Sequence, residues 1–139
     1  MTEQYSGGYS TQIIDQFKQR NFSKQGAFLQ SYLSAGLTVL DCGCGPGSMT
    51  LDIAELVNPG QVFGIDSSPI QVEQALLMQK ERAIINASFT YGSAYSLPYV
   101  DEQFDVVFAH AVLYHLQKPE QALAEFFRVL KPGGLVALR

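Results

Sequence analysis

Short apolar runs bounded by turn residues recur along this chain of 139 residues. Runs of this kind predict buried strands, because a parallel sheet that is covered on both faces has apolar side chains on both. The runs lie at residues 38–41, 62–65, 89–91, 104–109 and 135–138. Since helical stretches separate them, the pattern predicts a doubly wound, Rossmann-like α/β fold, with a parallel sheet, right-handed crossovers and helices on both faces.

Apolar residues between these runs recur at helical spacing. We predict helices over 49–57, from Pro69 to about Arg82, and over 120–129. Ser68 is expected to cap the second helix, with Gln71 returning a capping-box hydrogen bond. The third helix is expected to turn four apolar side chains toward the sheet, namely Ala122, Leu123, Phe126 and Phe127.

Residues 1–36 are predicted to form an N-terminal helical segment ahead of a single α/β domain at 37–139. Apolar residues mark two short helices in it, one at Ile13, Ile14 and Phe17, and one at Phe28, Leu29, Tyr32 and Leu33 that ends near Gly36. The first ten residues are expected to be mobile unless a ligand orders them, in which case Tyr5 and Tyr9 could close over it.

The composition is that of an ordinary enzyme domain. Hydrophobic residues make up 47% and charged residues 16%, enough apolar material for one core. The formal net charge is −4 and no basic cluster occurs, which argues against a nucleic acid partner. No apolar run approaches membrane-spanning length and no signal segment is visible, so we expect a cytoplasmic protein without membrane association.

The first predicted strand ends in a glycine turn, Asp41-Cys42-Gly43-Cys44-Gly45-Pro46-Gly47. A strand, a glycine turn, a helix and an acid after the next strand are the parts that bind a nucleoside cofactor at the edge of a parallel sheet. Here the acid is Asp66, which favours a ribose without a 2′-phosphate. Ser48 stands where a dinucleotide fingerprint has its third glycine. The turn therefore predicts a ligand with an adenosine but no pyrophosphate.

The two cysteines of the turn, Cys42 and Cys44, lack the second ligand pair that a zinc site needs. They are also too close together to form a disulfide readily. We expect one to face the core and the other the loop, as small filler beside the turn. No metal site is predicted.

Four blocks in this order resemble the class I S-adenosylmethionine-dependent methyltransferases, in particular the small-molecule group related to the quinone-biosynthesis C-methyltransferases. The blocks are Val39–Gly47 (VLDCGCGPG), Gly64–Ser68 (GIDSS), Gly92–Tyr99 (GSAYSLPY) followed by Phe104–Ala109 (FDVVFA), and Leu130–Leu135 (LKPGGL). The resemblance implies the strand order 3-2-1-4-5, with the ligand where the order reverses. It also implies S-adenosylmethionine as methyl donor, S-adenosylhomocysteine as product and a small-molecule acceptor.

The resemblance implies a role for each matching residue. It places Asp41 at the methionine amino group, Gly43, Gly45 and Gly47 along the methionine and ribose, Asp66 on the ribose hydroxyls, Ser67 and Ile70 beside the adenine, and Ser93 and Ala94 at the adenine edge. The family often has aspartate where this chain has Ser93, although a hydroxyl can still bond the adenine amine.

Two histidines follow the fourth predicted strand. His110 is the candidate to contact the methionine part or to act as a base, and the alternative is that it caps the strand end or packs. His115 lies where such chains commonly carry a structural histidine. We therefore expect any catalytic histidine to be His110.

The sequence stops after the fifth predicted strand. Members of the resembled family continue through a further helix and an antiparallel strand pair, so this is either part of a longer chain or a naturally short form. The strand Leu135–Leu138 would then have a free hydrogen-bonding edge, which tends to pair with another chain. We expect a homodimer through this edge.

Three functions remain open from the sequence. The first is a methyltransferase, or its cofactor-binding part, that acts on a small molecule. The second is a non-catalytic S-adenosylmethionine-binding module. The third is a nicotinamide-dependent oxidoreductase, which Ser48 disfavours.

Overall fold

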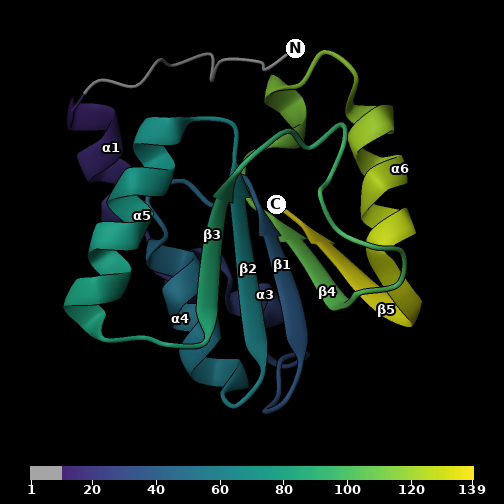
Figure 1. Ribbon diagram of the computed structural model, residues 1–139, viewed down its shortest axis with the longest axis horizontal. Helices are drawn as coiled ribbons and strands as arrows, with labels where there is room; N and C mark the ends of the chain where they lie inside the picture. Colours follow the sequence, from purple (N-terminus) through teal and green to yellow (C-terminus); the bar gives the residue numbers. More distant parts are fainter. Residues whose placement is uncertain (1–10) are drawn as a thin grey trace.

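The computed structural model describes residues 11–139, which form a twisted five-stranded sheet with helices on both faces (Figure 1). All strand pairs are parallel, and the order β3-β2-β1-β4-β5 confirms the predicted order. The strands are β1 (Thr38–Cys42), β2 (Gln61–Asp66), β3 (Ala87–Tyr91), β4 (Phe104–Ala109) and β5 (Leu130–Leu138). Each contains the apolar run predicted for it. The expectations for Tyr5 and Tyr9 lie outside the described residues.

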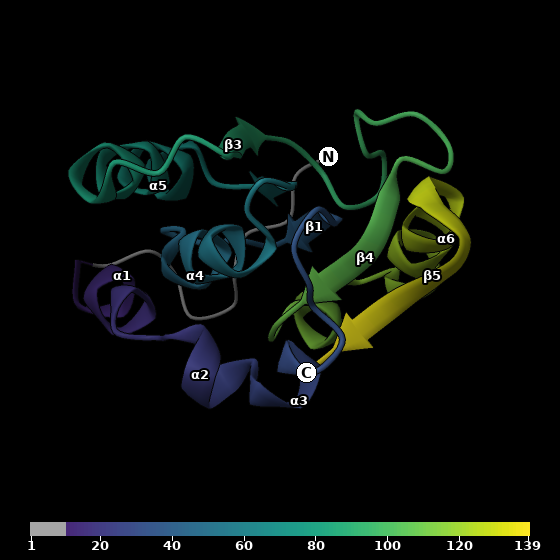
Figure 2. The ribbon, with the colours of Figure 1, turned by 90° about the horizontal axis from the view of Figure 1, so that it is seen from below.

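Helices cover both faces of the sheet (Figure 2). They are α1 (Thr11–Lys18), α2 (Phe22–Gln25), α3 (Ala27–Gln30), α4 (Ser48–Val57), α5 (Pro69–Arg82) and α6 (Pro119–Val129), with a 3₁₀ turn η1 (Leu113–His115). The helices before α6 lie on one face, and α6 packs on the other. Within residues 11–139, none of the helices has the length and apolar character needed to cross a bilayer.

The core has two layers, because successive side chains of a strand point to opposite faces. On β1, Val39 packs in the layer under α2–α4, and its neighbour Leu40 packs in the layer under α6. Both side chains are fully buried. The alternation continues on β4, where Phe108 joins the first layer and Val107 the second.

The second N-terminal helix, expected at Phe28, Leu29, Tyr32 and Leu33 and ending near Gly36, is shorter than expected: it is the single turn α3, which ends at Gln30. A further single turn, α2, precedes it, and the two are separated at Gly26, where a Cβ would clash with the Phe22 ring. Phe22 stands edge-on to the Phe108 ring at 6.1 Å, which ties this segment to the sheet core. The segment therefore shares the core of the α/β domain, and the boundary expected at residue 36 stays a prediction.

Two details of the later helices also differ from expectation. Phe127 on α6 is 65% exposed and does not face the sheet, whereas Ala122 and Phe126 are fully buried. Ser68 accepts a hydrogen bond from the backbone N–H of Gln71, as a capping residue should. The Gln71 side chain does not complete the capping box, because the Ser68 N–H is bonded to Asp66 instead.

Candidate functional site

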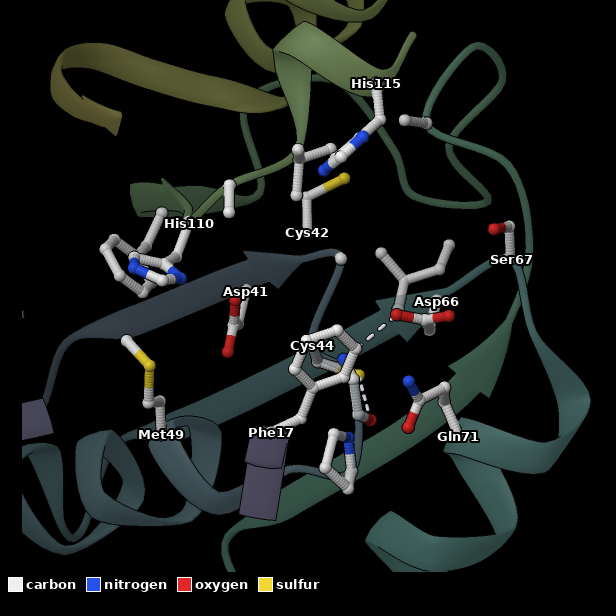
Figure 3. A pocket seen from close by; sticks show the side chains of 18 of the residues that line it. Phe17, Asp41, Cys42, Cys44, Met49, Asp66, Ser67, Gln71, His110 and His115 are labelled. Atoms are coloured by element: carbon white, nitrogen blue, oxygen red, sulfur yellow. Dashed lines mark hydrogen bonds between the residues drawn. The ribbon is translucent and has the colours of Figure 1, made fainter. Parts of the chain in front are cut away.

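A pocket opens at the carboxyl ends of β1, β2 and β4 (Figure 3). This is the point where the strand order reverses, between β1 and β4, and open α/β sheets bind their ligands there. Phe17 and Arg20 bring the N-terminal segment to the same pocket. Ser48 at the start of α4 holds α1 in place by donating to the Phe17 carbonyl oxygen at 3.1 Å. The pocket therefore joins parts of the chain that are far apart in sequence.

The glycine turn forms the floor of the pocket. Gly43, Gly45 and Gly47 have φ of 77°, 56° and 87°, a region that only glycine enters at low cost. A Cβ on Gly45 would meet no atom within 4 Å, so its backbone is open to a ligand. A Cβ on Gly47 would lie 2.9 Å from Ala75 and 3.0 Å from Phe89. Gly47 therefore permits close packing against α5 and β3, and it does not line the pocket.

Asp66 lies at the end of β2 and is tied to the turn. Its Oδ2 accepts a hydrogen bond from the Gly45 N–H at 2.9 Å, and its Oδ1 accepts one from the Ser68 N–H at 2.9 Å. Burial raises the pKa of Asp66, and the two backbone hydrogen bonds oppose that rise. Because a carboxylate has about four acceptor positions, both oxygens can still accept from a ligand.

Asp41, at the end of β1, is the second carboxyl group of the pocket. It is almost fully buried, and its Oδ2 accepts a hydrogen bond from the Thr50 hydroxyl at 2.6 Å. Burial raises the pKa of Asp41 to about 7, the nearby Asp66 raises it further and the Thr50 bond lowers it. At neutral pH this group therefore titrates, which an exposed aspartate would not do.

The cysteines of the turn, Cys42 and Cys44, are both buried and both line the pocket. Burial raises the pKa of each thiol, so both stay protonated. Such thiols are weak nucleophiles. No group of three metal-binding side chains occurs within residues 11–139.

His110 lines the pocket beside Asp41 (Figure 3), and the guanidinium of Arg20 contacts its ring. Its Nδ1 lies 3.4 Å from Nη1 of Arg20. Burial, together with Arg20 and Arg139, lowers the pKa of His110 to about 4. The imidazole is therefore neutral at pH 7, and Nδ1 acts as the acceptor for Arg20.

Most of the residues expected at the site gather around the pocket. Those that line it are Asp41, Gly43, Gly45, Asp66, Ser67, Ser93, Ala94 and His110. Asp41 and His110 lie toward one end, and Asp66 and Ser67 toward the other (Figure 3). Gly47 and Ile70 do not line the pocket. Ile70 is 49% exposed and lies outside the pocket lining, so the expectation that its side chain borders a ligand is not met.

Gln71, which follows Ile70, lies where Ile70 was expected to lie. Gln71 is only 1% exposed and lines the pocket at the Asp66 end (Figure 3). Its Oε1 is buried without a hydrogen-bond partner. The sequence carried one signal that Gln71 is buried: it lies four residues before the small apolar Ala75, and residues four apart share one face of a helix. No local pattern pointed to Arg20, which reaches the site through the packing of α1.

Comparisons with known proteins agree with this geometry. A family model described as a methyltransferase domain matches residues 33–139. An uncharacterized methyltransferase of Schizosaccharomyces pombe is 37% identical, with 97% of this chain and 51% of that protein covered. A demethylmenaquinone methyltransferase of Lactococcus lactis is 39% identical, with 88% and 49% covered. The crystal structure of the [4+2]-cyclase SpnF has a TM-score of 0.73 and 34% identity, with 91% and 43% covered.

This chain spans about half the length of the curated relatives it matches. The family model nevertheless covers the whole sheet, including every strand that builds the pocket. The resemblance of the four sequence blocks, the strand order and these relatives all agree. The chain belongs to the class I S-adenosylmethionine-dependent methyltransferases.

Proposed function

We propose that this pocket binds S-adenosylmethionine and that the chain is the cofactor-binding part of a methyltransferase that acts on a small molecule. The observation that carries the proposal is the nucleoside end of the pocket. There Asp66 keeps acceptor positions that face the pocket, and the amide side chain of Gln71 lines the same end. A ribose supplies the O–H donors that Asp66 can still accept, and an adenine offers polar edges to the amide of Gln71.

The residues divide into two sets along the pocket. Asp66 would accept from the ribose hydroxyls, and Ser67, Gln71, Ser93 and Ala94 would surround the adenine. At the other end, Asp41 would accept from the methionine ammonium, with Gly43 and Gly45 beside the chain and His110 near its end. A positive charge placed beside Asp41 would favour its ionised form and lower its pKa from about 7. Gly47 and Ile70 would act only through packing.

When bound, the cofactor supplies a methyl group on a sulfonium, which needs no protein nucleophile. The residues of the chain would therefore hold and align the two reactants and keep water out. His110 is better suited to contact the ligand as a neutral side chain than to act as a base, because its pKa is about 4 and its Nδ1 faces Arg20. Proton removal from the acceptor is not assigned to it.

The acceptor and the assembly remain proposals. We propose a small-molecule acceptor and no nucleic acid, in keeping with the net charge of −4. A homodimer through β5 and a cytoplasmic location stay predictions from the sequence. The similarity to SpnF, whose name is that of a cyclase, favours one second candidate: a chain that binds S-adenosylmethionine without transferring its methyl group.

Calorimetric titration tests the proposal. The chain should bind S-adenosylhomocysteine with a stoichiometry of about one, and it should not bind NADH with comparable affinity. Binding of NADH alone would overturn the assignment in favour of an oxidoreductase. Transfer of a labelled methyl group to a cell extract then separates a methyltransferase from a non-catalytic binding module.

Replacement of Gln71 by leucine should raise stability and weaken binding at once. Leucine removes a buried acceptor without a partner, whose burial costs about 1–3 kcal/mol. The same change removes a contact to the nucleoside, so the affinity for S-adenosylhomocysteine should fall about tenfold. Thermal unfolding and calorimetry measure the two effects.

Gln79 on the same helix provides the matched control. Its Nε2 donates to the carbonyl oxygens of Ile84 and Ala87, away from the pocket. Gln79→Leu should therefore lower the melting temperature and leave the affinity unchanged. Equal binding by the Gln71→Leu and parent chains would remove Gln71 from the proposed site.

A further inference from the structure

Arg20 is held in a defined position at the edge of the pocket. It follows α1, lines the pocket, and places its guanidinium 4.4 Å from the centroid of the Phe17 ring. Its Nη1 lies 3.4 Å from Nδ1 of His110. Stacking on an aromatic ring and a hydrogen bond to an imidazole both restrict where a guanidinium can point.

No carboxylate balances this charge within residues 11–139. Among the described residues, the cations that form ion pairs are Arg82, Arg128 and Lys131, and Arg20 is not one of them. His110 is neutral at pH 7, and Arg139 is a second cation whose charge acts on it. Asp41 shares this end of the pocket, but its Oδ2 is bonded to Thr50. A half-buried guanidinium in this setting has open donors for an anion.

The shape of a guanidinium selects the anion. Its N–H groups form a planar fork that matches the two oxygens of a carboxylate, and such paired hydrogen bonds are among the stronger ones in proteins. An ammonium at Asp41 and a carboxylate at Arg20 would together satisfy both charged groups at this end of the pocket. A neutral ligand would leave the Arg20 charge uncompensated.

We propose that Arg20 forms a carboxylate-binding site in this pocket. The inference rests on the proposed function, which supplies two sources for the carboxylate. It belongs either to the amino acid end of the methyl donor or to an acid group on the acceptor. The chemistry at Arg20 is the same in both, and the experiment separates them.

The first arm compares two nucleosides on the parent and Arg20→Gln chains. S-adenosylhomocysteine carries the amino acid end, and methylthioadenosine lacks it. If the carboxylate is that of the donor, Arg20→Gln should bind S-adenosylhomocysteine about tenfold to 100-fold more weakly. Methylthioadenosine should bind both chains equally, which also shows that the pocket remains folded.

The second arm uses chains saturated with S-adenosylhomocysteine. Benzoate serves as the acidic probe, and benzamide is its neutral isostere. If the carboxylate belongs to the acceptor, benzoate should bind the parent chain more tightly than benzamide, and Arg20→Gln should remove this preference. The affinity for S-adenosylhomocysteine would then be the same in the parent and variant chains.

Lys24→Gln is the matched control. It removes one positive charge from the same N-terminal segment, at an exposed position that does not line the pocket. Lys24→Gln should match the parent in both arms, which excludes a general effect of net charge. If Arg20→Gln also matches the parent in both arms, the inference is overturned. If the parent binds neither nucleoside, the proposed function itself fails.

Discussion

Replacement of Asp66 by alanine should lower the affinity for S-adenosylhomocysteine about 100-fold. The change removes the acceptors proposed for the two ribose hydroxyls, and hydrogen bonds to a charged group contribute about 1.5–3 kcal/mol each. It also leaves the N–H groups of Gly45 and Ser68 without their acceptor, which loosens the turn that faces the ligand. Calorimetric titration of both chains measures the loss.

The control for this variant is another aspartate that accepts from the backbone. Asp105 on β4 accepts from the Thr38 N–H at 2.8 Å and pairs with Lys131, away from the pocket. Asp105→Ala should lower the melting temperature while keeping the affinity of the parent. If Asp66→Ala binds as tightly as Asp105→Ala, Asp66 makes no contact with the ribose.

Replacement of Asp41 by asparagine should stabilise the free chain at about pH 8 by up to about 4 kcal/mol, by less than half as much at about pH 5, and hardly at all at about pH 3. In the folded chain the pKa of Asp41 is about 7, against an ordinary value of 3.8. Between these two values the folded state holds a proton that the unfolded state has lost. The free energy of unfolding therefore falls as the pH rises through this window, and above it the full cost of the buried charge is present.

Asparagine cannot ionise and can still accept the hydrogen bond from Thr50, so the variant should lack this part of the pH dependence. His110 acts in the opposite direction, because its pKa is lowered to about 4 and the unfolded state binds more protons below its ordinary value. Asp66, whose pKa is raised, acts in the same direction as Asp41. His110 and Asp66 are present in both the parent and the Asp41→Asn chain. The difference in the free energy of unfolding between these chains therefore reports on Asp41.

Urea unfolding of the two chains at several pH values measures this difference. The stability curves should meet near pH 3, diverge between about pH 4 and pH 7, and run parallel above about pH 8. Curves that are parallel over the whole pH range would show that folding does not raise the pKa of Asp41. The same measurement with S-adenosylhomocysteine present should reduce the difference, because a ligand ammonium would offset the buried charge.

The strands of the sheet were predictable because each one contains an apolar run that is recognisable from its own residues. In Phe104–Ala109, the predicted strand and β4 have the same bounds. The N-terminal segment was not predictable in the same way. The residues of α2 and α3 are too few to carry a helical period, and Gly26 separates them because the Phe22 ring packs against it.

The site shows the same division between local and distant information. The positive φ of Gly43 and Gly45 and the position of Asp66 after β2 follow from the local motif. The choice between Ile70 and Gln71 depended on which side of α5 faces the pocket, and the motif left that open. Arg20 could not be found at all, since its neighbour His110 is 90 positions away.

The sequence by itself determined the parallel sheet, the glycine turn whose backbone can approach a ligand closely, and the position of Asp66 after β2. These depend on side-chain periodicity and on the conformational freedom of glycine, which neighbouring residues carry. Only the tertiary structure decided that Gly47 packs against α5, that Gln71 is buried without a partner, and that Asp41 titrates near pH 7. Those properties depend on burial and on charges brought together from distant segments, and no local pattern encodes them.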